Sequence, residues 1–141
     1  MPSAEKTTTP TSVVDASALL AWLQDENGAP IVGAALDAGA AVSIINWTEA
    51  LSKIADDGKD PEMLMAELAA IGIDERTLWI EPITKADAIA IARMRPATRA
   101  QGLSLADRAC LALAARLGVP ALTTDHAWKH ATVDTDVTLI R

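Results

Sequence analysis

Short apolar runs alternate along the chain with longer segments whose apolar residues recur at helical spacing. The short runs predict five strands, at residues 13–14, 41–45, 77–80, 119–124 and 137–140. The longer segments predict helices, at residues 16–24, 30–38, 46–57, 61–70, 85–94 and 105–117. Strands that alternate with helices are typical of an α/β fold, so we predict a five-stranded parallel sheet flanked by helices on both faces.

Residues 1–11 lack this apolar pattern, and residues 12–141 contain it. Residues 1–11 are polar, contain two prolines and show no apolar period, so we expect a flexible leader. Residues 12–141 are expected to form one domain, because half of the 141 residues are hydrophobic and a chain of this length can bury one core.

The composition also bears on the compartment. The apolar runs fall short of the roughly 18 residues of a membrane span, and residues 1–12 lack the apolar core of a signal peptide. The single cysteine, Cys110, excludes an internal disulfide and lies among apolar residues, so a buried thiol is expected. These features predict a cytoplasmic protein.

Four acidic residues occupy related places. Asp15 and Asp125 directly follow predicted strands, and Glu49 and Asp107 fall in the first turns of predicted helices. Each could simply cap a helix: Asn46 and Ser104 precede Glu49 and Asp107 by three residues, which is the spacing of a capping box. Capping explains single acids at helix starts, but it does not explain why one sheet edge collects them without a balancing Lys or His in these segments.

Converging carboxylates repel one another and require a cation. A site made only of oxygen ligands, without Cys or paired His, favours Mg²⁺ or Mn²⁺ over zinc. His126 and His130 lie four residues apart, but a third soft ligand is missing beside them, so they are expected to be surface residues.

Four segments together resemble the motifs of PIN-domain ribonucleases, in particular the VapC toxins of bacterial toxin–antitoxin pairs. They are Val14-Asp15-Ala16-Ser17, Asn46-x-x-Glu49, Ser104-Leu105-Ala106-Asp107 and Thr123-Thr124-Asp125-x-Ala127-Trp128, and the resemblance spans residues 12–141. It implies a single PIN-like domain acting as the toxin of a type II toxin–antitoxin system. It also implies an antitoxin partner and a homodimer.

The resemblance further implies an endoribonuclease in which Mg²⁺ or Mn²⁺ activates a water that hydrolyses RNA phosphodiester bonds. The catalytic, metal-binding quartet would be Asp15, Glu49, Asp107 and Asp125. Ser17 and Thr124 either hydrogen-bond these carboxylates or the waters on the metal, or act as ordinary caps.

The net charge of −7 argues against a surface that coats polyanions in general. Locally, Arg93, Arg95 and Arg99 fall in a predicted loop at residues 93–102, which contains Pro96 and Gly102 and lies just before the helix that carries Asp107. They are either RNA-binding side chains or solvated surface charges.

The helical hairpins at residues 16–38 and 46–71 are more apolar than a small sheet requires. Part of this surface is expected to bind an antitoxin helix in a groove that includes Trp22 or Trp47, and the alternative for either tryptophan is core packing.

Two other functions compete with the ribonuclease interpretation. A phosphoacceptor receiver domain needs an Asp after the third strand and a Lys after the fifth, whereas Glu81-Pro82 and Arg141 stand there. A catalytically inactive PIN-fold interaction module would keep the fold without the chemistry, and retention of all four acids argues against it.

Overall fold

The structure is a computed structural model that describes residues 9–131 and 133–141. Its five strands form one parallel sheet in the order β3-β2-β1-β4-β5, as predicted. The strands are β1 (Ser12–Val14), β2 (Ala40–Ser43), β3 (Leu78–Glu81), β4 (Ala121–Thr123) and β5 (Val137–Leu139). This order differs from the 2-1-3-4-5 order of receiver-like sheets, which removes that rival.

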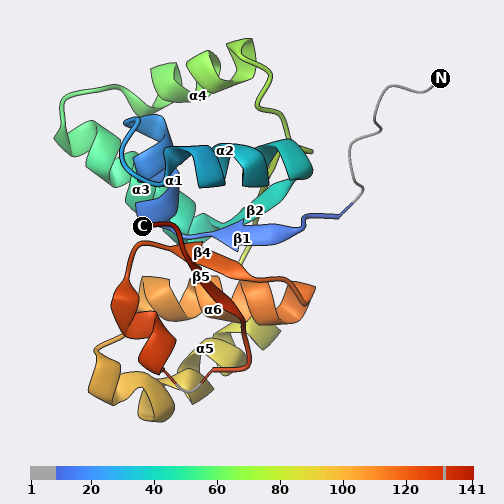
Figure 1. The fold of residues 1–141 in the computed structure, drawn as a ribbon, viewed down its shortest axis with the longest axis vertical. Helices are drawn as coiled ribbons and strands as arrows, with labels where there is room; N and C mark the ends of the chain where they lie inside the picture. Colours follow the sequence, from blue (N-terminus) through green and yellow to red (C-terminus); the bar gives the residue numbers. More distant parts are fainter. Residues whose placement is uncertain (1–8, 132) are drawn as a thin grey trace.

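Helices cover both faces of the sheet (Figure 1). They are α1 (Ala16–Leu23), α2 (Ala29–Ala38), α3 (Ile44–Asp56), α4 (Pro61–Ala70), α5 (Lys85–Thr98) and α6 (Leu105–Leu117), with short 3-10 helices η1 (Arg99–Gln101) and η2 (His126–His130). Helices α1 to α4 lie on one side of the sheet, and α5 and α6 lie on the other (Figure 1).

Alternating strand residues supply two separate cores, one on each face. Val14 and Val42 pack with the buried residues of α1, α2 and α3, while Val13 and Ala41 pack with Cys110 and the other buried residues of α6. The strands are short and buried on both faces, which is typical of a parallel sheet between two helical layers.

The predicted boundary between β2 and α3 was wrong. Strand β2 ends at Ser43 instead of at Ile45, because the Ser43 hydroxyl accepts a hydrogen bond from the backbone N–H of Asn46 at 3.0 Å and begins α3 there. Asn46 therefore does not cap the helix, and the expected capping box between Asn46 and Glu49 is absent.

The predicted arginine loop is helical. Helix α5 continues through Pro96 to Thr98, so Arg93 and Arg95 lie on its last turns and Arg99 begins η1. Pro96 is tolerated because it removes only one backbone donor near the helix end, and the buried Thr98 hydroxyl donates to the Met94 carbonyl at 2.7 Å.

The predicted leader falls mostly on residues 1–8, which lie outside the described residues. Thr11, its last residue, donates to the Gly39 carbonyl from its backbone N–H at 2.8 Å and from its hydroxyl at 3.1 Å. Within the described part of the chain, every helix is too short or too polar to cross a lipid bilayer.

Candidate functional site

The centre of the sheet holds the point at which the strand order reverses, between β1 and β4. In open α/β sheets this switch point is where ligands bind, at the carboxyl ends of the strands. Asp15 follows β1 at this end and Asp125 follows β4 two residues after its last residue, Thr123. The topology therefore places two of the four predicted acids at the expected edge.

Asp15 is almost fully buried, with 5% of its surface exposed. Its Oδ1 accepts hydrogen bonds from the Ala18 backbone N–H at 2.8 Å and from the Ser17 hydroxyl at 2.7 Å, and its Oδ2 accepts one from the Thr123 hydroxyl at 2.6 Å. Asp15 thus does cap α1, as the simpler interpretation proposed.

Burial raises the pKa of Asp15, and the nearby charge of Asp107 raises it further, while the three hydrogen bonds only partly oppose this. The carboxylate would therefore be stabilised by a positive charge. A carboxylate has about four lone-pair positions. The three donors leave one of these, on Oδ2, for a further ligand.

Thr123, and not the predicted Thr124, supplies the hydroxyl that reaches Asp15. Thr123 is fully buried and also accepts a hydrogen bond from the Asp125 backbone N–H at 3.1 Å, whereas Thr124 contributes its backbone N–H to Ser17 Oγ at 3.1 Å. The sequence signal was present, but β4 ends earlier than predicted, and the alternation of strand side chains then selects Thr123.

Glu49 and Asp107 come toward Asp15 from two different helices. Partial burial raises the pKa of Glu49, and the charges of Asp107 and Asp15 add to this effect, with Lys53 opposing it. Asp107 forms the predicted capping box: Ser104 N–H donates to Oδ2 at 2.8 Å, and Asp107 N–H donates to Ser104 Oγ at 3.1 Å. The second oxygen of Asp107, Oδ1, accepts no hydrogen bond from the described residues.

Asp125 is more exposed than Asp15 and caps a different helix. Its Oδ1 accepts a hydrogen bond from the Ala127 N–H at 2.9 Å and caps η2, and its side chain is exposed. The charges of Asp15, Glu49 and Asp107 thus act on one another's surroundings, and Asp125 is linked to Asp15 through the Thr123 hydroxyl that both contact.

The chemistry of these residues fits a hard divalent cation. All the candidate metal-ligand atoms are carboxylate oxygens, and Asp15 retains one open lone pair. Among residues 9–131 and 133–141, no group of three acidic, His or Cys side chains already converges as a set of ligands. Mg²⁺ is commonly held by one or two carboxylates and several waters, so the arrangement fits a water-rich site.

Cys110 lies behind this site. It is completely buried, and burial together with the charges of Asp15, Asp107 and Glu49 raises the pKa of its thiol well above the usual range. The thiol therefore stays protonated and uncharged, as expected for a core residue. His126 and His130 are both exposed, and His126 Nε2 lies 2.9 Å from the Arg141 carbonyl, in agreement with surface histidines.

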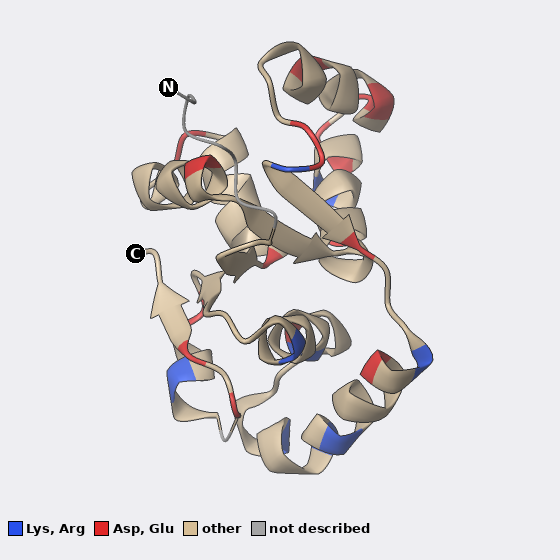
Figure 2. Ribbon diagram, turned by 90° about the vertical axis from the view of Figure 1, so that its right-hand side faces the viewer, with Lys and Arg blue, Asp and Glu red and all other residues tan. Residues whose placement is uncertain are grey.

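Charge is divided between the two halves of the molecule (Figure 2). Residues 12–81 contain thirteen acidic and three basic residues, whereas residues 82–141 contain five acidic and eight basic ones. Arg93, Arg95 and Arg99 are exposed in the basic half, which includes α5 and α6. Arg108 does not join them, because it is half-buried and donates from Nη1 to the Ile91 carbonyl at 2.9 Å.

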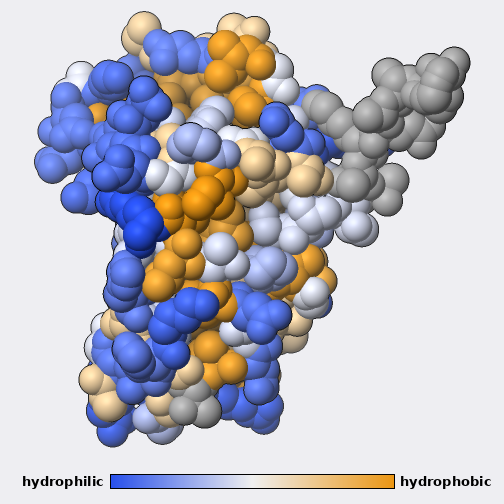
Figure 3. All heavy atoms as spheres, in the orientation of Figure 1, coloured by the Kyte–Doolittle hydropathy of each residue, from blue (hydrophilic) through white to orange (hydrophobic). Residues whose placement is uncertain are grey.

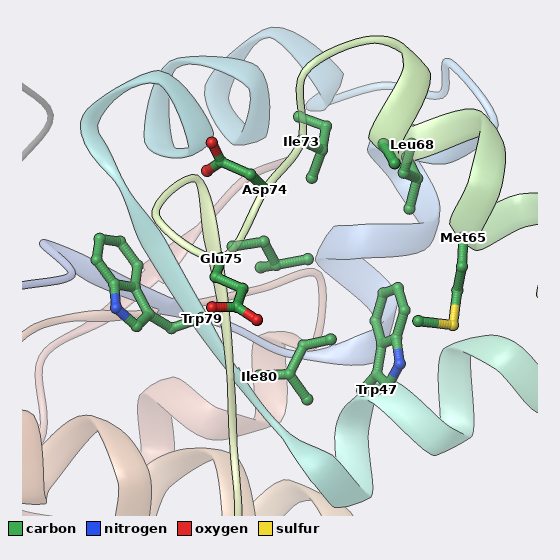
Figure 4. Close-up of a pocket in the computed structure, with 10 residues that line it drawn as sticks. Trp47, Met65, Leu68, Ile73, Asp74, Glu75, Trp79 and Ile80 are labelled. Carbon is green, nitrogen blue, oxygen red and sulfur yellow. The ribbon is translucent and has the colours of Figure 1, made fainter.

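Two apolar grooves border α4, near which hydrophobic side chains reach the surface (Figure 3). The first, of about 540 Å³, is lined by Trp47 from α3, Met65 from α4 and Ile80 from β3, with Asp74 and Glu75 beside them (Figure 4).

The second groove, of about 520 Å³, is lined by Trp22, Leu64 and Ile71 among others. Trp47 also belongs to the core and is almost fully buried, while Trp22 is half-buried. Each tryptophan therefore combines core packing with a groove wall.

The hydrogen bond between Thr123 and Asp15 predicts that replacing the Thr123 hydroxyl by a methyl group destabilises the protein more than the same exchange at Thr124. Thr123→Val keeps the volume but removes the hydrogen-bond partner of Asp15 Oδ2 and that of the Asp125 N–H, so it should lower the free energy of unfolding by about 1–3 kcal/mol. Chemical denaturation measures this loss. Thr124→Val is the matched control and should change stability much less. Equal losses in the two variants would contradict the assigned hydrogen bonds.

Comparison with known proteins supports this architecture. Proteins of curated function give no match to the sequence. Among solved structures, a toxin-antitoxin complex from Klebsiella pneumoniae superposes with a TM-score of 0.69 and 19% identity, covering 92% of this chain and 98% of that one. FitAcB from Neisseria gonorrhoeae gives a TM-score of 0.69 and 17% identity, covering 92% and 97%.

A third similar structure, DNA-bound VapBC from Salmonella typhimurium, has a TM-score of 0.69 and 13% identity, and the match covers 93% of this chain and 98% of that one. At these identities the likeness establishes the fold alone. The family comparison adds a direct sequence match to the PIN domain over residues 12–133, which includes all four predicted acids. The chain therefore belongs to the PIN domain family.

Proposed function

We propose that this protein is a metal-dependent endoribonuclease that serves as the toxin of a type II toxin–antitoxin pair. The observation that carries the proposal is the grouping of Asp15, Glu49 and Asp107 near the strand switch point, where burial and the charge of Asp107 raise the pKa of both Asp15 and Glu49. The similar structures from toxin–antitoxin complexes support the biological role.

Each acid has a role in this proposal that follows from its surroundings. Asp15 and Asp107 would hold Mg²⁺ or Mn²⁺ through the oxygens that their caps leave open, and a bound metal would neutralise charge and lower the pKa of a water. Glu49, which is the most accessible of the three, binds the metal or accepts a proton from the attacking water.

Asp125 completes the proposed quartet from the exposed side, where RNA approaches. Ser17 and Thr123 keep the Asp15 carboxylate in one orientation, and Thr124 fixes Ser17 through its backbone N–H.

The proposed RNA surface is the exposed face of α5 and η1. Arg93, Arg95 and Arg99 lie on this surface, and α5 packs against α6, whose first turn carries Asp107. Guanidinium groups bind phosphates without reading the sequence, so these residues would hold the RNA beside the carboxylates.

Loss of these contacts predicts a change in salt dependence. Arg95→Ala combined with Arg99→Ala should weaken RNA binding and flatten the slope of log K against log salt by roughly 0.7–1 unit for each lost phosphate contact. Titrations of labelled RNA at several salt concentrations give the slope. Arg76→Ala removes an exposed arginine from the acidic half and should leave the slope unchanged. An unaltered slope in the double variant would place the RNA elsewhere.

The function itself is tested by incubating the purified protein with RNA, with and without Mg²⁺ or Mn²⁺. Cleavage that requires the metal and stops on chelation supports the proposal. An inactive PIN-fold interaction module is the second candidate, favoured by the absence of three converged ligands among the described residues. Metal binding without cleavage of any RNA, together with capture of the antitoxin, would support that module.

The remaining partner proposals concern assembly. An antitoxin segment is proposed to occupy the grooves beside α4, and a homodimer is proposed from the resemblance to VapC toxins. Light scattering on the isolated protein tests the dimer.

A further inference from the structure

A buried asparagine side chain joins the first turns of α3 and α6. Asn46 is 1% exposed, and its Nδ2 donates to the Ala106 carbonyl at 3.0 Å. Its Oδ1 accepts a hydrogen bond from the Ser43 hydroxyl at 2.5 Å, and the same hydroxyl accepts from the Asn46 backbone N–H at 3.0 Å. The amide group is therefore fixed in one orientation by partners on both of its ends.

Neither helix needs this side chain in order to begin. Ser43 caps α3, and Ser104 and Asp107 form the capping box of α6. The Ala106 carbonyl lies inside α6, where a backbone N–H four residues later is its ordinary partner. Burying an amide is also more costly than burying an apolar group of the same size. The bond from Asn46 to Ala106 is therefore an additional link between two helices.

The link lies between two acids of the candidate site. Glu49 follows Asn46 by three residues, so the two side chains lie on the same face of α3. Asp107 directly follows Ala106 in the chain. Like charges on Glu49 and Asp107 push the two helix ends apart, and the hydrogen bond between Asn46 and Ala106 opposes that movement.

We propose that Asn46 is a positioning residue that holds Glu49 and Asp107 at a separation at which both interact with one divalent cation. This inference rests on the proposed function, because it concerns the same metal site. Partners that orient metal ligands without touching the metal are typically worth 10- to 100-fold in metal affinity. Removal of the Asn46 amide should therefore weaken metal binding while the fold persists.

The experiment measures Mn²⁺ binding by calorimetry. Asn46→Leu keeps the approximate volume of the side chain but removes the amide, and we expect it to weaken Mn²⁺ binding by about 10-fold or more. Ile54→Val is the control, since Ile54 is a buried residue of the same helix whose truncation disturbs the core without touching the link. It should lower the melting temperature and leave the Mn²⁺ affinity unchanged.

A double-mutant cycle separates positioning from general destabilisation. If Asn46 acts through Glu49, then Asn46→Leu should have little further effect on Mn²⁺ affinity in a Glu49→Gln background. Full additivity of the two losses would overturn the inference. Asn46→Ser provides a second test should the leucine variant not fold, and an affinity equal to that of Ile54→Val would also overturn it.

Measurements on the parent protein distinguish failure of the Asn46 role from failure of the proposed function. A parent that binds Mn²⁺ and cleaves RNA, with variants at Asn46 that bind Mn²⁺ as tightly, would overturn the positioning role alone. A parent that neither binds Mn²⁺ nor cleaves RNA would overturn the proposed function and this inference together.

Discussion

Asp15→Asn is expected to abolish metal-dependent RNA cleavage while leaving the fold intact. Loss of a direct ligand should reduce the cleavage rate by at least about 100-fold, the upper range for residues that merely orient ligands. The amide can keep all three contacts, because its oxygen accepts from Ala18 and Ser17 and its nitrogen can donate to the Thr123 hydroxyl. Cleavage assays at saturating Mn²⁺ and circular dichroism measure the two properties separately.

Asp56→Asn is the matched control, because Asp56 is an exposed acid at the far end of α3. It should cleave RNA at the parent rate. Cleavage at the parent rate by Asp15→Asn under saturating metal would show that the site is assigned wrongly.

The same variant should show a pH-dependent gain in stability when no metal is present. Because burial raises the pKa of Asp15 above its ordinary value of 3.8, the folded protein binds this proton more tightly than the unfolded chain does. Protonated Asp15 therefore stabilises the folded protein below the ordinary pKa. This stabilisation is lost as the pH rises through the folded-state pKa. The melting temperature of Asp15→Asn relative to the parent should therefore increase from about pH 4 to pH 7.

Asp87 affects the pH dependence of stability with the opposite sign. Its contribution cancels when the melting temperature of the parent is subtracted from that of Asp15→Asn. Burial alone would raise the pKa of Asp87, but hydrogen bonds from Thr84 and the Arg116 guanidinium outweigh it and lower the pKa. That pair is the same in both proteins. A relative melting temperature that does not change with pH would contradict the raised pKa of Asp15.

The sequence was most informative where one local signal acts alone. The alternation of apolar runs predicted the parallel sheet, and the Ser104 to Asp107 spacing predicted a capping box that the structure contains. Prediction failed where two local signals compete. Ile44 and Ile45 extend the β-branched run of β2, yet the Ser43 cap begins the helix before them.

Spatial relations between distant segments were harder to predict. Pro96 suggested the end of α5, but packing of the buried Thr98 carries the helix past it. The four acids were predicted from position, but the sequence could not show that the charge of Asp107 acts on both Asp15 and Glu49. Such coupling depends on how α3 and α6 are joined, and the Asn46 link that joins them has no periodic signature.

The surface around α4 predicts the chemistry of the protein partner. Residues 56–75 contain seven acidic residues and one lysine, and they border the two apolar grooves. Met65 and Ile71, which line the first and second groove, are 48% and 68% exposed. An acidic surface with apolar grooves is complementary to a helix that has one apolar face and basic flanks. The antitoxin segment is therefore expected to be basic and amphipathic.

Met65→Glu combined with Ile71→Glu should weaken binding of that segment by roughly 30-fold or more, the equivalent of about 2 kcal/mol for central interface residues. The variant places charges in the grooves and adds to an already acidic surface, while both positions are exposed enough for the fold to tolerate them. Co-expression with the neighbouring reading frame, followed by affinity measurement, tests the expectation. Ile89→Glu is the control, because Ile89 is 55% exposed on α5, in the opposite layer. Equal binding by the double variant and this control would show that the antitoxin docks away from α4.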